Sequence, residues 1–274
     1  MARQRVPEGP PAAPAVQKLR IRYAKRGRLR FSSTRDFQRS LERAVRRAGV
    51  PMAYSSGFHP HPKISYANAA PTGTASEAEY VEISVVERLD PERLAGALDA
   101  ALPPGLDVVH VAEAQSGALA DLLQASLWRM EFQGMDAADL SRALEVFLAE
   151  DEVLVTRSMK KGPRTFDVRQ AVLDVEVADP SDTDEMRAAD EAERAPCAIL
   201  HVVVRHTTPV VRPDDVLTAL SSTAALTPPA PPLVTRLAQG PLLTEPARVA
   251  DPLAADQEAV GARPVTRLTR ADRA

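Results

Sequence analysis

Two periodicities alternate along the first third of the chain, and their order limits the folds open to it. Apolar and basic side chains alternate over residues 18–24, the period-two pattern of a strand with one buried face and one basic face. The next apolar side chains recur at the spacing of one helix face: Phe37, Leu41, Ala44, Val45 and Ala48. Because Ser32, Ser33 or Thr34 can cap this helix and Gly49 can end it, we expect a strand and then a helix.

Three further strands and a second helix follow, up to residue 112. Apolar and β-branched segments bounded by turn residues predict strands at 64–69, 80–86 and 106–112. Pro91 after Asp90 begins a helix that runs to residue 102. The resulting order β-α-β-β-α-β is that of the ferredoxin-like fold, an antiparallel sheet with two helices on one face. We therefore expect residues 18–114 to form one basic α+β unit.

A second pass through this order is expected in residues 126–240, after a short linker. Strands are predicted at 128–133, 153–158, 198–204 and 233–237, helices at 137–149 and 213–220, and a mixed segment at 166–177. The two halves share little visible identity. Their common order nevertheless predicts an α+β fold of two ferredoxin-like domains in tandem.

Three segments lack an apolar face and are predicted to lie outside both units. Residues 1–17 hold four prolines and are interpreted as a disordered leader. Residues 179–196 carry seven acidic side chains and are interpreted as a solvated insertion in the second unit. Residues 241–274, rich in proline and alanine, are interpreted as a flexible tail.

Composition excludes several classes of protein. No apolar run approaches the roughly 18 residues of a membrane span, and the first 17 residues lack the apolar centre of a signal peptide. The single cysteine, Cys197, cannot form an internal disulfide or hold an iron–sulfur cluster alone. We therefore expect a cytoplasmic protein with no membrane partner and no cofactor of its own.

Charge is distributed unevenly along the chain. The formal net charge is −3, yet residues 18–63 contain 13 basic and two acidic residues, and ten of the 13 are arginine. Because the arginine fork matches phosphate and stacks on bases, RNA is the first interpretation, and a solvated helix face is the alternative. The predicted contacts in this segment are Arg20, Arg22, Arg28, Arg30, Arg35, Arg39, Arg43, Arg46 and Arg47.

Residues 54–63 combine aromatic rings, imidazoles and a lysine in a proline-rich stretch. Tyr54 and Phe58 can stack on bases, and His61 and Lys63 can meet a phosphate, so these four complete the predicted RNA-binding set. His61 is also the candidate acid or base of a metal-independent RNA cleavage. The alternative is a loop packed over the sheet. We predict no metal site, because His59 and His61 lack a third ligand at a suitable spacing.

The second half offers weaker signals. Lys160, Lys161 and Arg164 surround Gly162 at an expected hairpin tip, for which an ordinary charged turn is the favoured interpretation. The chain contains no Ser-His-Asp spacing, Walker loop or paired-carboxylate motif that would indicate a specific class of enzyme.

Four stretches, at residues 30–36, 43–51, 54–65 and 73–80, resemble the radical SAM-linked proteins, a bacterial family without an established activity. Weaker resemblances lie at 161–162, 167–169 and 212–213. The resemblance implies a protein encoded beside, or fused to, a radical SAM enzyme. Thr34 stands where many relatives carry histidine, and His59 where they often carry asparagine. His61 and Lys63 remain as the polar pair that matches the family.

Three functions are compatible with these observations. The first is a non-catalytic RNA-binding or substrate-presenting module associated with a radical SAM enzyme or with RNA metabolism. The second is a metal-independent RNA-processing enzyme that uses His61. The third is an accessory subunit that docks its basic face on a radical SAM protein partner.

Overall fold

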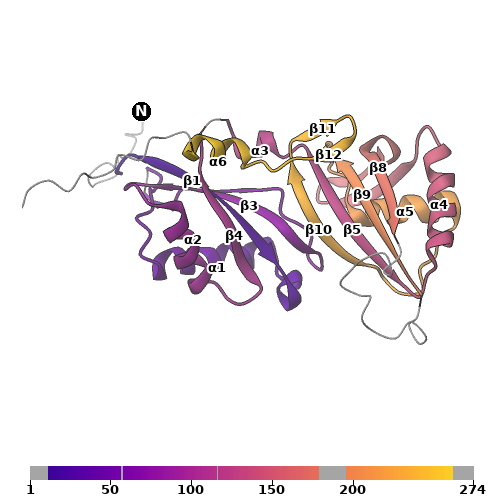
Figure 1. Cartoon of the computed structure of the whole chain (residues 1–274), viewed down its shortest axis with the longest axis horizontal. Helices are drawn as coiled ribbons and strands as arrows, with labels where there is room; N and C mark the ends of the chain where they lie inside the picture. The colour runs from indigo at the N-terminus through magenta and orange to yellow at the C-terminus, as the bar shows by residue number, and fades with distance from the viewer. Residues whose placement is uncertain (1–11, 57, 116, 179–195, 262–274) are drawn as a thin grey trace, which may run out of the picture.

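The computed structural model describes residues 12–56, 58–115, 117–178 and 196–261. Within them the chain forms a large mixed sheet and six α-helices, so the predicted α+β class is confirmed (Figure 1). The main sheet has the strand order β4-β1-β3-β10-β5-β9-β8, and β2 pairs with β3 beside this path. No helix in the described ranges is long and apolar enough to cross a membrane.

The first half of the sheet comes from residues 17–113. Its elements are β1 (Gln17–Lys25), the short 3-10 helix η1 (Gly27–Phe31), α1 (Thr34–Arg47), β2 (Ile64–Ala67), β3 (Ala75–Val85), α2 (Pro91–Ala101) and β4 (Leu106–Glu113). The strands are antiparallel in the order β4-β1-β3-β2. Residues 12–16 precede β1, and Gln17, predicted to belong to the leader, is the first residue of that strand.

The second half follows a short linker helix, α3 (Leu119–Leu122). Its elements are β5 (Ala125–Gln133), α4 (Ala137–Ala149), β6 (Leu154–Met159), β7 (Gly162–Asp167), η2 (Arg169–Ala171), β8 (Val172–Ala178), β9 (Cys197–Arg205), α5 (Pro213–Ala224) and β10 (Leu233–Gly240). The antiparallel order is β10-β5-β9-β8. The strand expected at 153–158 exists, but it pairs with β7 in a separate hairpin, and β8 takes the edge of the main sheet.

The halves meet where β3 and β10 run parallel, paired through Thr235 with Ala75 and Arg236 with Ser76. Each half has its own apolar core. The first packs α1 and α2 on the sheet around Phe37, Leu41 and Leu98, and the second is built around Trp128 and Phe132. The seam between the two cores is therefore held by few strand pairs, and its side chains, described below, are polar.

The prediction of a flexible tail from residue 241 is wrong for residues 241–261. They form β11 (Leu242–Thr244), β12 (Ala247–Val249) and α6 (Ala254–Gly261). Leu253 is fully buried in a cluster with Tyr80 and Ala112, on β3 and β4. The contacts of this segment include the buried Leu253 and the pairs Asp256–Arg20 and Asp251–Arg22, and its sequence shows no periodic apolar pattern. The predictions for residues 1–11, 179–195 and 262–274 lie outside the described residues.

Candidate functional site

Helix α1 is placed by its cap and its apolar side. The Ser33 hydroxyl accepts from the Asp36 backbone N–H at 3.2 Å, and the Asp36 carboxylate accepts from the Ser33 N–H at 3.1 Å, which forms a capping box. The Ser33 hydroxyl also donates to the Asp36 carboxylate at 2.7 Å, and this bond, together with that from the Ser33 N–H, lowers the pKa of Asp36. Phe37 and Leu41 are buried beneath the helix, and the Phe37 ring stacks on Tyr23 of β1 at 4.0 Å. The opposite side of α1 therefore faces solvent.

Five arginines occupy that solvent side. At about 3.6 residues per turn they fall within an arc of about 120°, and all five are exposed: Arg35, Arg39, Arg43, Arg46 and Arg47. We call them the arginine face. Arg43 donates to the Ser40 hydroxyl and Arg46 to the Glu42 carbonyl, each at 3.1 Å. None of the five forms an ion pair with another described residue.

A groove runs beside the arginine face, between α1 and the loop that leads to β2. Val45 and Arg46 line it from the helix, and Met52, Tyr54 and Pro62 line it from the loop. The two sets of residues expected to bind RNA, on the helix and in the loop, are thus neighbours. Tyr54 is 43% exposed.

The loop is held in a defined hairpin-like shape. Tyr54 and Pro62 form an isolated bridge, the Ser55 N–H donates to the His61 carbonyl at 2.8 Å, and the Lys63 N–H donates to the Ala53 carbonyl at 2.7 Å. The side chains of Phe58, His61 and Lys63 are exposed, and so is that of His59. The loop therefore presents its rings and cations to solvent instead of packing them over the sheet.

The side chain of His61 is not held by neighbouring groups in the described part of the chain. Its backbone N–H donates to the Ser55 hydroxyl at 3.0 Å, but among the described residues its imidazole has no hydrogen-bond partner. An acid or base in catalysis is normally oriented by a second group. The described residues also contain no cluster of side chains that could hold a metal ion.

Three of the predicted RNA contacts are used inside the protein, and Arg20 is the clearest correction. Its side chain is 1% exposed and pairs with Glu82 at 3.1 Å and with Asp256 at 3.0 Å. The alternation that placed Arg20 on a basic strand face was right, but the segment after residue 240 covers that face. Arg20 is therefore a structural residue, and its assignment to the RNA-binding set is wrong.

Arg22 and Arg30 are also engaged, and Arg28 is not. Arg22 donates to the Glu77 carbonyl at 2.9 Å and lies 4.0 Å from Asp251 of the C-terminal segment. Arg30 donates to the carbonyls of Gly73 at 2.8 Å and Val234 at 3.3 Å, which ties η1 to both halves. Arg28 is exposed in η1, away from these contacts. Of the predicted RNA contacts, the arginine face, Arg28 and the neighbouring loop are thus left exposed.

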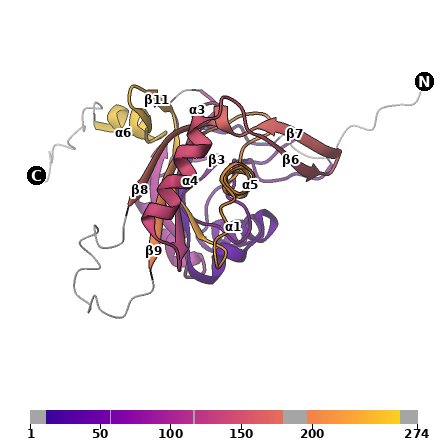
Figure 2. The ribbon, with the colours of Figure 1, turned by 90° about the vertical axis from the view of Figure 1, so that its right-hand side faces the viewer.

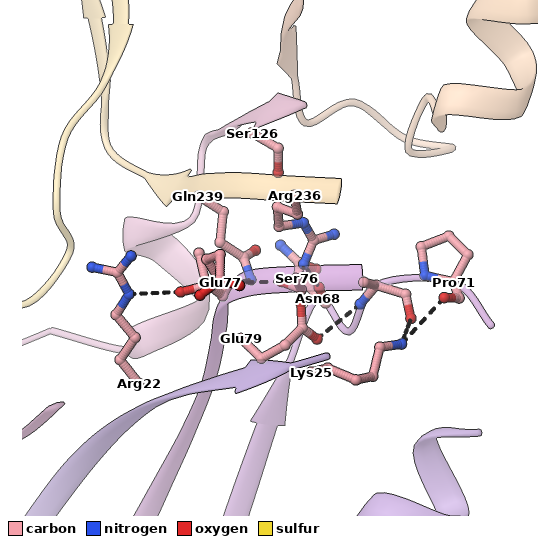
Figure 3. Close-up of polar contacts among 12 residues, drawn as sticks. Arg22, Lys25, Asn68, Pro71, Ser76, Glu77, Glu79, Ser126, Arg236 and Gln239 are labelled. Carbon is pink, nitrogen blue, oxygen red and sulfur yellow. Dashed lines mark hydrogen bonds and ion pairs between the residues drawn. The ribbon is translucent and has the colours of Figure 1, made fainter. Parts of the chain in front are cut away.

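A buried polar cluster lies at the seam between β3 and β10 (Figure 3). Arg236 donates to Glu79 at 2.9 Å and to the Asn68 carbonyl at 2.7 Å, and its guanidinium lies 4.5 Å from the Trp128 ring centroid. Burial lowers the pKa of Arg236. Glu79 also accepts from the Ala70 N–H at 2.9 Å. The Arg236–Glu79 pair therefore joins the two halves across the seam.

Lys25, at the end of β1, lies next to this pair. Its ammonium donates to the carbonyls of Ala70 and Pro71 at 3.3 and 3.2 Å, and burial lowers its pKa. A small cavity beneath the start of α1 is lined by Lys25, Thr34, Tyr66 and Glu79, among others. The Tyr66 hydroxyl is buried without a partner among the described residues, and burial raises its pKa.

Sequence reasoning missed this cluster. Thr34 and Glu79 belong to the stretches quoted for the family resemblance, and the structure brings them to one cavity. Lys25 is one of the 13 basic residues in 18–63, and a charge count does not show that it is buried at the end of β1. The sequence signal that could have indicated the cluster is Glu79, a carboxylate between Ala78 and Tyr80. All three residues are buried in the structure.

Residues 18–213 match the family model of DUF2344, described as an uncharacterized protein conserved in bacteria. The chain belongs to this family. In this DUF2344 protein the matched span includes the arginine face, the loop and Glu79, and it ends at the first residue of α5. Arg236 and the C-terminal segment lie beyond it. No curated protein matches the chain.

Proposed function

We propose that this DUF2344 protein binds RNA through the arginine face and the adjoining loop, without catalysing a reaction. The observation that carries the proposal is the arc of five exposed arginines, which lack ion pairs within the described part of the chain. Guanidinium groups that lack a carboxylate partner can turn the fork toward phosphate oxygens. Arg26, which is also exposed, is paired with Glu77 and Asp107. The arginine face differs from Arg26 because it gathers five arginines without carboxylate partners among the described residues on one side of a single helix.

The loop adds a means to hold bases. Tyr54 and Phe58 are 43% and 60% exposed, although aromatic rings are among the side chains that gain most from burial. Stacking of a base on such a ring contributes about 1–3 kcal/mol and tolerates any sequence. Phosphates along α1 and bases over the loop would together accommodate a single strand. This supports RNA with unpaired bases as the ligand class.

A salt titration tests the proposal. Fluorescence anisotropy of a labelled single-stranded RNA would compare the wild type with Arg39→Ala/Arg43→Ala/Arg47→Ala. We expect affinity to fall as salt rises, and the triple variant to bind at least tenfold more weakly. Its slope of log affinity against log salt should shrink by about 2, since each lost contact to a single strand contributes about 0.7.

A matched variant controls for net charge. Arg142, Arg205 and Arg248 are exposed and lie in the second half or the C-terminal segment. Replacing these three by alanine removes the same charge and should leave affinity within about twofold. Equal losses in both triple variants would reject the arginine face, and no salt-sensitive RNA binding by the wild type would reject RNA as the ligand.

The proposal that the protein does not catalyse a reaction depends on the surroundings of His61. The described residues supply no second group that holds its imidazole, so we expect RNA to be recovered intact after prolonged incubation with the protein. Cleavage that disappears in His61→Ala would instead establish the RNA-processing alternative.

We also propose that each half is a ferredoxin-like unit, as the sequence order suggests. The order β4-β1-β3-β2 of the first half corresponds to β10-β5-β9-β8 of the second, with two helices in each.

A radical SAM enzyme is the partner we propose for the intact system, since two of the resembling stretches, 43–51 and 54–65, lie on the arginine face and its loop. Co-purification that survives nuclease treatment would support a protein partner, and its loss would indicate a link through RNA.

A further inference from the structure

We infer that the β6–β7 hairpin is a second contact for the same RNA, so that the preferred ligand is a strand long enough to reach both halves of the sheet. This inference rests on the proposed function. It assigns the basic hairpin tip to the interface, and it sets a minimum length for the ligand.

The hairpin is basic and separate from the main sheet. Its strands pair along their whole length, from Leu154 with Asp167 to Met159 with Gly162. No acidic residue occurs between positions 154 and 166. The side chains of Lys160, Lys161 and Arg164 are exposed, and none of the three forms an ion pair with any other residue in the described ranges. An ordinary charged turn would carry counter-charges nearby.

The hairpin is fixed to the body of the protein partway along β6, at Arg157, which lies opposite Arg164 of β7. Arg157 of β6 pairs with Asp215 of α5, donates to the Val210 carbonyl at 3.1 Å and lies 5.0 Å from the Phe166 ring centroid. Asp215 is buried and the Arg157 side chain is 18% exposed, so this ion pair is partly shielded from water. This attachment holds Arg164 and the two tip lysines, Lys160 and Lys161, at a defined position, which lowers the entropy lost when a ligand binds.

The hairpin projects on the same side of the sheet as the arginine face. Figure 2 shows β6 and β7 extending beyond α5, on the side where α1 also lies, while α6 lies on the other side. Each strand of the hairpin has six residues and is therefore about 20 Å long. Helix α1, with 14 residues, is about 21 Å long. A short oligonucleotide can cover the arginine face alone, whereas only a longer strand extends to the hairpin.

Ligand length separates the two contacts experimentally. Affinities of RNAs of about 6 and about 24 nucleotides, lengths that bracket common single-strand sites, would be measured for the wild type and for Lys160→Ala/Lys161→Ala/Arg164→Ala. We expect the hairpin variant to bind the long RNA about tenfold more weakly, with a salt slope smaller by about 2, and to bind the short RNA as the wild type does. The arginine-face variant should lose affinity for both.

Each outcome decides a different statement. If the wild type binds neither RNA, the proposed function fails. If the arginine-face variant loses affinity while the hairpin variant binds both RNAs normally, only the inference fails. Equal weakening of short and long RNA by the hairpin variant overturns the length requirement, and equal affinity for DNA of the same length overturns the assignment to RNA. Unchanged thermal unfolding verifies that the exposed substitutions leave the fold intact.

Discussion

Among single residues, Arg236 and Glu79 form the most consequential pair, because each is almost fully buried and they come from different halves of the sheet. Replacing Arg236 by methionine keeps most of the side-chain volume but removes the guanidinium that donates to Glu79, and Lys25 is then the buried cation that remains nearby. We expect Arg236→Met to lower the free energy of unfolding by about 3–5 kcal/mol, measured by urea denaturation.

The double variant separates charge from packing. Arg236→Met/Glu79→Gln removes both charges, so it should be less destabilised than either single variant if the buried charge causes the loss. Additive losses in the double variant would assign the effect to packing against Trp128 instead. The same cycle shows how much of the seam depends on this ion pair.

His206 predicts a pH dependence. Its Nδ1–H donates to the Leu123 carbonyl at 2.6 Å, so the neutral Nε2 accepts from the Ser126 hydroxyl at 2.8 Å. Burial lowers the pKa of His206 below its ordinary 6.5. Between the folded and unfolded pKa values the unfolded chain binds more protons, so stability rises with pH through this window and is lost as pH falls below about 6.5.

His206→Gln removes this titration. Urea midpoints at about pH 7.5 and about pH 5.5 should show that acidification destabilises the wild type more than the variant. His59→Gln, at an exposed position, serves as the control and should follow the wild type. A wild type and a His206→Gln variant with the same pH dependence would mean that this imidazole titrates alike in the folded and unfolded states.

At the scale of elements, the C-terminal segment is packed on the main sheet, with α6 against β4 and β12 against β5, β9 and β10. Leu253 is fully buried there, so Leu253→Ala should lower the free energy of unfolding by about 2–4 kcal/mol. Leu243, 53% exposed in the same segment, is the control, and Leu243→Ala should change stability by no more than about 0.5 kcal/mol. Equal, negligible effects would show that the segment detaches in solution.

Most elements could be predicted because their signals are local. The period of the apolar side chains and the caps at Ser33 and Asp90 set α1 and α2, and α4 has the predicted bounds. The C-terminal segment could not be predicted, because its stability comes from contacts such as Asp256 with Arg20, which are 236 residues apart. The strand predicted at 153–158 was expected in the main sheet but pairs with β7 instead, because periodicity predicts a strand and not its partner.

The candidate site shows the same division. The arginine face follows from helical spacing, so its five residues could be read from the sequence. Arg20 and Arg30 could not be separated from it, since charge counts do not show which cations meet a carboxylate or a carbonyl in the fold. The seam cluster was missed because Lys25, Glu79 and Arg236 come together only when the halves join.

At the scale of the whole molecule, two apolar cores share one sheet through a narrow seam. The strand pairing across it involves only two residue pairs between β3 and β10. Side chains reinforce it: Gln239 donates to the Ala78 carbonyl at 2.6 Å, and Arg30 reaches Val234. Separating the two halves would break the buried ion pair between Arg236 and Glu79. We therefore expect the halves to unfold together.

A substitution far from the tryptophan tests this coupling. Leu98 is fully buried in the first core, and Trp128, the only tryptophan, lies in the second. Leu98→Ala should destabilise the first half by about 2–5 kcal/mol. If the seam couples the halves, the urea midpoint seen by Trp128 fluorescence falls together with that seen by circular dichroism. A fluorescence midpoint that stays at the wild-type value, while the circular dichroism transition splits, would mean that the second half folds independently of the first.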